Sequence, residues 1–424
     1  MDKLSKSNIN TQGAASERQA KRRNYRPLVS SAALKKTMGR YYALTNYHRY
    51  WGKPLNRPLA WVTSGAPVEL LRAFKIHPAY PEQYAAIYST HKATVALCEA
   101  AETEGYSLDL CSYARSNIGG VLRPDLAPYG GMPKPDLLVA CNNICGTVLK
   151  WYEVLARYFD VPLLVLDTPF LTGELTSQAK EYVLNQLHNM VSELEKITGR
   201  KFKEKDLAQQ MRLSSEITSL WKETRQFCQA VPSPLNAPDL FIHMAPIVVL
   251  RGSQKGIDYY HQLKEEVKDR VTKSQGAVEN ERIRLVWDNI AIWPQVFAFN
   301  KLFSERGACF VTDTYSGGWA VDHAPGTPME SLAATYTEVF LNRCPDFRAN
   351  QLINLIREYK ANGFVMHSNR SCKPYSLVQK VIRRKVMRET GVPGLMIEAD
   401  MADPRAYAAE AVRNRVQAFL ETFD

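Results

Sequence analysis

The sequence of 424 residues has no uninterrupted apolar run long enough to span a membrane, and its charged N-terminus lacks the apolar core of a secretory signal. Its eight cysteines are unevenly spaced and nothing in the chain indicates secretion, which argues against a disulfide framework and leaves buried thiols or metal ligands. We therefore predict a cytoplasmic protein without a membrane segment.

Several common catalytic and cofactor motifs are also missing. The chain has no GxGxxG after its first predicted strand and no GxxxxGK[ST] loop, so neither the usual dinucleotide site nor a P-loop is predicted. It also contains no HExxH and no GxSxG.

The formal net charge of +11 arises in the N-terminal part of the chain. Residues 1–57 contain 13 Lys and Arg against two acidic residues, whereas residues 58–424 contain 41 of each sign. We interpret residues 1–57 as a solvated, partly disordered basic arm, with contact to a partner subunit as the alternative. Nucleic-acid binding is not predicted, because the rest of the chain has no basic stripe with interleaved aromatic residues.

Hydrophobic periodicity predicts an α/β fold. Apolar runs typical of buried strands alternate with helical stretches over residues 58–175 and 281–424, while residues 176–280 have the periodicity of charged helices. The predicted architecture is two doubly wound, Rossmann-like lobes joined by a helical section. The predicted strands are 59–63, 76–80, 136–141, 162–167, 283–287, 309–312, 363–367 and 394–398.

Three cysteines, Cys111, Cys145 and Cys372, follow predicted strands or precede predicted helices, where ligands bind in open α/β sheets. Free N–H groups and the positive end of the helix dipole lower the pKa of a cysteine and suit a thiolate ligand. Four other cysteines lie in helical, apolar or nondescript segments and are interpreted as buried hydrophobes: Cys98, Cys228, Cys309 and Cys344.

Spacing alone does not decide what these cysteines do. Cys141 and Cys145 form a single CxxxC, which is not the paired CxxC of a zinc site. A hydrolase with Cys145 as nucleophile would need a histidine base, and His367 is the histidine near a cysteine motif. A metal site and a nucleophilic cysteine therefore both stay open on the residues alone.

Four segments together resemble the (R)-2-hydroxyacyl-CoA dehydratase and benzoyl-CoA reductase family. They are DLCSYARSNIG (109–119), PDLLVACNNIC (135–145), NRSCK (369–373) and ADPRA (402–406), within a resemblance that runs from about residue 60 to 423. In that family each subunit holds a [4Fe-4S] cluster by three cysteines, and the resemblance assigns this role to Cys111, Cys145 and Cys372. It places Cys141 in the neighbouring strand, outside the ligand set.

Three thiolates leave one iron of a cubane open. As the resemblance implies, that iron meets the thioester carbonyl of an acyl-CoA, one electron gives a ketyl radical, and water is eliminated from an (R)-2-hydroxyacyl-CoA. In the reductases the electrons pass to an aromatic ring. The resemblance also implies a heterodimer with a second cluster-binding subunit and a separate ATP-hydrolysing iron–sulfur activator, which agrees with the missing ATP motif.

Three further residues carry over from the resemblance. Ser64 matches a small hydroxyl residue that approaches the substrate or the open iron, and its alternative role is to cap the helix in which Pro67 takes an early position. Glu82 matches a carboxylate that relays protons, with a solvated loop acid as the alternative. Arg370 either tunes the cluster, pairs with a CoA phosphate, or forms a plain salt bridge.

The residues of these motifs do not decide between dehydration and ring reduction. CNNIC and NRSC favour the dehydratase subunit that binds substrate, whereas residues 251–260 resemble the large benzoyl-CoA reductase subunit. A cluster-free binding or scaffold subunit is the alternative from another class. We predict dehydration of an (R)-2-hydroxyacyl-CoA, with Glu82 and Ser64 as catalytic residues.

Overall fold

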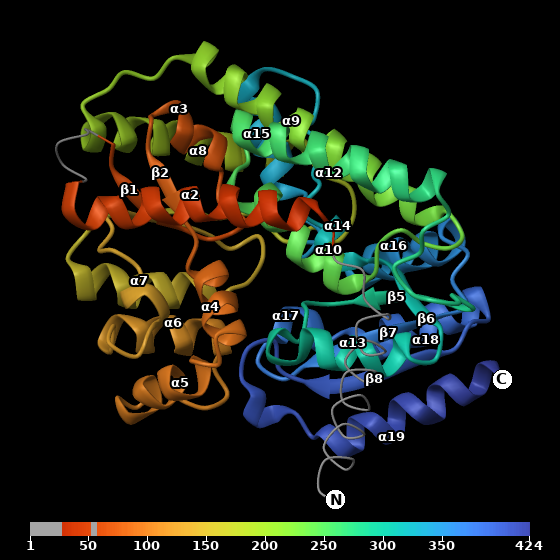
Figure 1. The fold of residues 1–424 in the computed structure, drawn as a ribbon. Coiled ribbons are helices and arrows are strands. Elements are labelled where there is room, and N and C mark those ends of the chain that lie inside the picture. The colour runs from red at the N-terminus through yellow and green to blue at the C-terminus, as the bar shows by residue number, and fades with distance from the viewer. Residues whose placement is uncertain (1–27, 52–56) are drawn as a thin grey trace, which may run out of the picture.

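The computed structural model describes residues 28–51 and 57–424. Two four-stranded parallel sheets lie at its centre, with orders β2-β1-β3-β4 and β6-β5-β7-β8, and helices pack around both (Figure 1). The strand bounds are β1 Leu59–Val62, β2 His77–Ala79, β3 Leu137–Cys141, β4 Leu163–Leu166, β5 Ile283–Asp288, β6 Ala308–Asp313, β7 Gly363–Asn369 and β8 Gly394–Ala399.

The strands form where apolar runs can be buried on both faces of a sheet. Strands β1, β3, β5 and β6 are buried along their whole length, as expected for parallel sheets covered on two sides. Strand β4 lies at an edge of its sheet and is correspondingly more exposed. All eight predicted strands are present with ends shifted by one or two residues, and the α/β class is confirmed.

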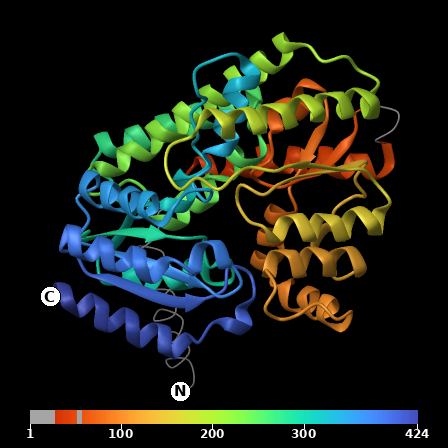
Figure 2. The same ribbon diagram turned by 180° about the vertical axis from the view of Figure 1, so that it is seen from behind.

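Helices cover both faces of each sheet (Figures 1 and 2). On the first sheet, α3 and α8 lie on one face and α7 on the other; on the second, α16 and α18 lie opposite α13 and α19. The bounds of these helices are α3 Val68–Ala73, α7 Thr147–Phe159, α8 Ser177–Thr198, α13 Val296–Ser304, α16 Pro345–Glu358, α18 Gln379–Thr390 and α19 Ala409–Leu420.

The segment between the two sheets is helical, as predicted. Its main helices are α8, α9 (Glu204–Gln226), α10 (Ala237–His243), α11 (Ala245–Val249) and α12 (Gln254–Thr272). Helix α9 packs against both α3 and α12, and α15 (Pro328–Thr337) returns from the second sheet to pack against α8. Within the described residues, no helix combines the length and apolar character needed to cross a membrane.

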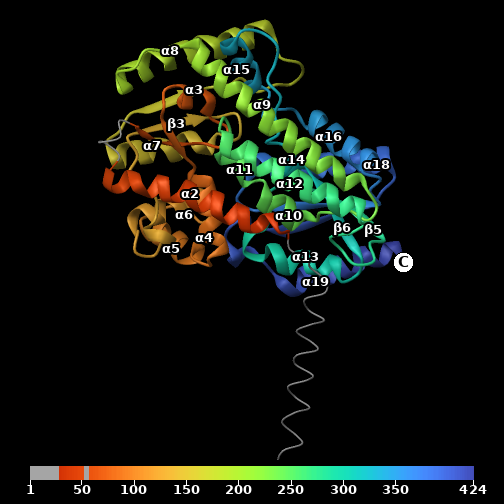
Figure 3. The same ribbon diagram turned by 45° about the horizontal axis from the view of Figure 1, so that its top comes forward.

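Part of the predicted basic arm belongs to the folded body. Helix α2 (Ser30–Trp51) packs against α12 (Figure 3), and its Leu34, Met38 and Tyr41 are buried. A carboxylate of α12, that of Glu266, accepts hydrogen bonds from the backbone N–H groups of residues 29 and 30 at 2.6 and 2.7 Å. The interpretation as a solvated arm is therefore wrong for α2, while residues 1–27 and 52–56 lie outside the described residues.

Candidate active site

The site begins where each sheet reverses its strand order. The chain adds β2 on one side of β1 and β3 on the other, and it repeats this pattern with β5, β6 and β7. Such a reversal opens a crevice at the carboxyl ends of the central strands, where ligands bind. Ser64, Cys145, Ile290 and Cys372 follow β1, β3, β5 and β7 in turn, and all four line one cavity. The crevices of the two sheets therefore meet in a single space.

This space, the cysteine cavity, has a volume of about 700 Å³ including its part open to solvent. Cys111, Cys145 and Cys372 all line it, although they are far apart in the sequence. Cys111 lies at the start of α6 (Ser112–Leu122) and Cys372 at the start of the short α17 (Lys373–Ser376). Cys145 lies just before α7, where its Sγ accepts a hydrogen bond from the backbone N–H of Thr147 at 3.2 Å. The prediction that these three cysteines lie close together agrees with the structure, in which they line one cavity.

The surroundings of the thiols indicate what the cavity is suited to hold. Burial, and then the neighbouring thiols, raise the pKa of Cys111 well above its usual range and that of Cys372 to about 12. Backbone N–H groups at the two helix starts lower these pKa values, as expected, but burial outweighs them. Three adjacent, half-buried thiolates would require a compensating positive centre, and thiolates are the ligands of iron–sulfur clusters. The donor set therefore fits such a cluster.

Two serines join the cysteine loops of the two sheets. The backbone N–H of Ser112 donates to Ser371 Oγ at 3.1 Å, and the Ser371 hydroxyl donates to Ser112 Oγ at 3.2 Å. The backbone N–H of Ser371 donates in turn to Asp400 at 3.2 Å. Both serines are buried, and each is the chain neighbour of a cavity cysteine. The sequence analysis missed this pair, whose one available signal was adjacency to Cys111 and Cys372.

Glu82, in the first turn of α4 (Pro81–Thr90), also lines the cavity. The backbone N–H of Ser64 donates to its Oε1 at 3.0 Å, while Oε2 is enclosed and has no hydrogen-bond partner within the described residues. Burial raises the pKa of Glu82 to about 7, although hydrogen bonds from Ser64 oppose the shift. A carboxyl with this pKa can hold or release a proton near neutral pH. The alternative of a solvated loop acid is wrong.

Ser64 does not cap the following helix. Pro67 occupies the N-cap position of α3 and provides no side-chain cap, so the capping alternative for Ser64 is wrong. Ser64 is instead buried beside Glu82 and lines the cavity, which leaves its predicted catalytic role as a proposal.

A second space, the outer cavity, adjoins the cysteine cavity and has a volume of about 760 Å³ including its part open to solvent. Its lining shares five residues with the cysteine cavity: Ser64, Glu82, Tyr113, Tyr315 and Trp319. The indole Nε1 of Trp293 donates to the Tyr113 hydroxyl at 2.5 Å, which fixes that ring at the junction. Burial raises the pKa of both tyrosines, so they stay protonated at neutral pH.

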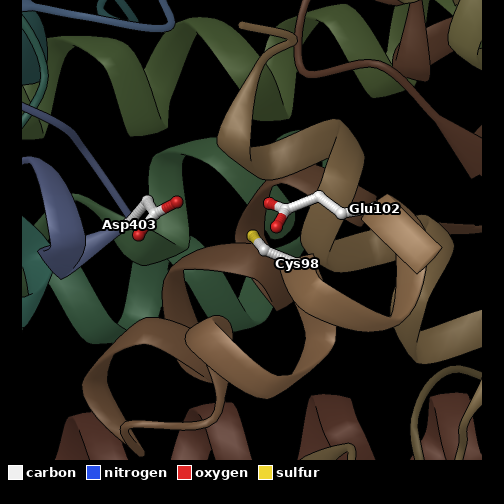
Figure 4. Close-up of side chains that lie close together, drawn as sticks. All are labelled: Cys98, Glu102 and Asp403. Atoms are coloured by element: carbon white, nitrogen blue, oxygen red, sulfur yellow. The ribbon is translucent and has the colours of Figure 1, made fainter. Parts of the chain in front are cut away.

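Cys98, Glu102 and Asp403 place possible ligand atoms within 4.8 Å of one another (Figure 4), and none of the three lines the cysteine cavity. Arg115 and Arg405 each pair with both carboxylates. Burial raises the pKa of the Cys98 thiol to about 12. Because the two guanidinium groups already balance the carboxylates, we interpret this group as an ion-pair cluster that ties α5 (Thr94–Thr103) and α6 to the loop after β8, and not as a metal site.

The remaining candidates lie apart from the cysteine cavity. His367 is fully buried in β7, its Nδ1 is hydrogen-bonded to the carbonyl of Ile290 at 2.7 Å, and it is absent from the cavity lining. This removes the base that a nucleophilic Cys145 would need. Arg370 lines a separate hollow and forms no ion pair within the described part of the chain. Cys98, Cys228 and Cys309 are buried as predicted, whereas Cys344 is only half-buried.

Comparison with known proteins identifies the family. Residues 63–423 match the family model described as 2-hydroxyglutaryl-CoA dehydratase, D-component. The chain belongs to this family. It is 34% identical to the alpha subunit of the (R)-2-hydroxyisocaproyl-CoA dehydratase of Clostridioides difficile, over 88% of this chain and 91% of that one. It is 32% identical to the alpha subunit of the lactoyl-CoA dehydratase of Anaerotignum propionicum, over 86% of this chain and 90% of that one.

The family includes reductases as well as dehydratases. The chain is 28% identical to one subunit of the benzoyl-CoA reductase of Thauera aromatica, over 84% of this chain and 86% of that one. The prediction that the chain is an enzyme subunit of this dehydratase and reductase family is confirmed.

Proposed function

We propose that this chain is the [4Fe-4S] subunit of an ATP-activated (R)-2-hydroxyacyl-CoA dehydratase, with Cys111, Cys145 and Cys372 as the cluster ligands. The observation that carries the proposal is the convergence of these three thiols in one cavity that also contains the Glu82 carboxyl, whose pKa burial raises to about 7. The two facing strand reversals support doubly wound, Rossmann-like lobes as the scaffold of this site.

Each part of the cavity has a separate task in the proposed reaction. When bound, the cluster supplies a low-potential electron and an open iron that acts as a Lewis acid toward the thioester. The Ser64 backbone orients Glu82, whose free Oε2 holds or accepts a proton next to the substrate. Trp151, Phe340 and Met401 line the walls and exclude water.

The proposed assembly is a heterodimer with a second cluster-binding subunit, served by a separate ATP-hydrolysing activator. A match of 24% identity to the beta subunit of the (R)-phenyllactyl-CoA dehydratase of Clostridium sporogenes supports a complex of related subunits. The convergence of the three thiols disfavours a cluster-free scaffold, and iron and sulfide analysis of anaerobically purified protein decides between the two.

Ring reduction by a benzoyl-CoA reductase is the second candidate, favoured by the match to the reductase of Thauera aromatica. Reductant consumption separates the two reactions. We expect the complete enzyme, supplied with activator, ATP and a trace of reductant, to convert many equivalents of an (R)-2-hydroxyacyl-CoA to enoyl-CoA. Stoichiometric reductant consumption with benzoyl-CoA, and no enoyl-CoA from any hydroxyacyl-CoA, would establish the reductase instead.

A further inference from the structure

Apolar side chains form most of the wall of the outer cavity. Helix α2 contributes Met38 and Tyr42, α4 contributes Ile87, and the α10–α11 segment contributes Phe241 and Val248. Among the described residues that line it there is no Lys, Arg or His, and its single carboxyl is Glu82 at the junction with the cysteine cavity. The cavity therefore offers a large apolar surface and nothing that neutralises an anion.

This lining decides which part of an acyl-CoA can enter. The phosphates of CoA would be desolvated there without a cationic partner. An uncharged hydrocarbon group has no hydrogen bonds to water that it would lose on binding. Each buried methylene strengthens binding by a factor of about four. A free carboxylate on the acyl group would be opposed by desolvation and, when Glu82 is ionised, by repulsion from that carboxylate.

Helix α2 is fixed to the body, so its two lining side chains form a stable wall. Besides the bonds from Glu266, the Tyr41 hydroxyl donates to the carbonyl of Pro78 at 3.1 Å. The Tyr42 ring packs edge-on against Tyr84, with ring centroids 5.6 Å apart. Met38 is only 7% exposed. The size of the outer cavity is thus set in part by a helix that lies ahead of the family match, which begins at residue 63.

We propose that the outer cavity binds the acyl side chain of the substrate, that this side chain is bulky, apolar and uncharged, and that Met38 and Tyr42 of α2 limit its size. The inference rests on the proposed function, since it takes the acyl-CoA to react at the junction of the two cavities.

Binding of saturated acyl-CoA thioesters, which cannot be dehydrated, tests the proposal independently of turnover. Their dissociation constants are measured by calorimetry on the anaerobic holoenzyme with its partner subunit. We expect 4-methylpentanoyl-CoA and 3-phenylpropanoyl-CoA to bind at least tenfold more tightly than propionyl-CoA and glutaryl-CoA. Glutaryl-CoA binding as tightly as the apolar thioesters would overturn the inference while leaving the dehydratase proposal standing. Absence of binding by every acyl-CoA would overturn both.

A matched pair of variants tests whether Met38 contacts the acyl side chain. Met38 and Leu34 lie one turn apart on α2 and are each 7% exposed, but only Met38 lines the outer cavity. Met38→Ala is expected to raise the dissociation constant of 4-methylpentanoyl-CoA several-fold and to leave that of propionyl-CoA unchanged. Leu34→Ala should preserve the ratio of the two dissociation constants. Ile87→Phe, which adds bulk to the part of the wall that α4 forms, should selectively weaken the binding of 3-phenylpropanoyl-CoA. Equal weakening of all thioesters by Met38→Ala and Ile87→Phe would place the pantetheine arm in the cavity and overturn the inference.

Discussion

At the scale of single residues, the environments of Cys141 and Cys145 differ although only three residues separate them. Cys145 lines the cysteine cavity, whereas Cys141 is fully buried in β3 and its backbone N–H donates to the Thr63 hydroxyl at 3.0 Å. Strand β3 ends at Cys141, and the loop that follows places Cys145 in the cavity where the two sheets meet.

This difference predicts the effect of two matched substitutions. Cys145→Ser should lose most of the bound iron, because a hard alkoxide replaces a soft thiolate poorly on iron. Cys141→Ser should retain the iron with a modest loss of stability. The measurement is iron and sulfide content per chain after anaerobic purification. Equal content in the two variants would show that Cys145 is not a ligand.

Glu82 should make stability and activity depend on pH. Its pKa is about 7 in the folded protein against an ordinary 4.5. Ionisation of Glu82 therefore lowers the free energy of unfolding as the pH rises from 4.5 through 7. The cost approaches about 3 kcal/mol above pH 8, at about 1.4 kcal/mol per pKa unit. Glu82→Gln removes the ionisation and should gain stability relative to the unmodified chain between pH 5 and 8.

Denaturant unfolding at several pH values checks this expectation. Glu181→Gln, which changes an exposed acid of α8, is the control and should follow the unmodified chain. Turnover by Glu82→Gln should fall by a factor of about 10² to 10⁴, the usual contribution of a positioned acid or base. Parallel stability curves for Glu82→Gln and the unmodified chain would contradict the burial of this carboxyl.

At the scale of elements, α6 is held against the second sheet at both ends of its first turn. Ser112 meets Ser371, and one turn further on the Arg115 side chain, 3% exposed, pairs with Glu102 and Asp403. The Arg115 Nε also donates to the carbonyl of Leu110 at 3.1 Å, in the loop before Cys111. The ion-pair cluster therefore fixes the position of a proposed ligand loop.

Arg115→Ala should lower the free energy of unfolding by about 3 kcal/mol, because it leaves the buried Asp403 and the half-buried Glu102 with Arg405 as their one remaining guanidinium partner. The variant should also release iron faster, because the Cys111 loop loses its support. Chemical denaturation and the rate of iron loss to a chelator measure the two effects. Arg123→Ala, which breaks an exposed pair with Asp125 just beyond the same helix, should change neither. Equal stability and equal rates of iron loss in Arg115→Ala and Arg123→Ala would show that the ion-pair cluster supports neither the fold nor the Cys111 loop.

At the scale of the whole molecule, the cysteine cavity is lined from both sheets of one chain, and the proposed reaction also requires a partner subunit and an activator. The sequence contains no P-loop motif, so the energy for electron delivery is expected from a separate activator. We predict that the purified chain alone produces no enoyl-CoA from an (R)-2-hydroxyacyl-CoA, and that addition of the partner subunit, activator and ATP restores turnover. Product formation by the isolated chain would contradict the proposed assembly.

The sequence by itself determined the secondary structure of most of this protein. Apolar runs such as 136–141 and 283–287 became buried strands because parallel strands covered on both faces need no polar residues. The position of each cysteine relative to a strand end or helix start also followed from local pattern, which is why Cys111, Cys145 and Cys372 could be singled out before the fold was known.

Only the tertiary structure decided what surrounds those cysteines. The burial that gives Glu82 a pKa of about 7, the serine pair that joins two loops, and the packing of α2 as a cavity wall all depend on residues distant in the chain. The sequence analysis assigned α2 to a basic arm because the charges of Lys35 and Lys36 can be counted in the sequence. The burial of Met38 and Tyr41 depends on the helices that pack against α2 and could not be predicted from local composition. Periodicity reports which face of an element is apolar, whereas burial, pKa and cavity shape are properties of the contact between elements.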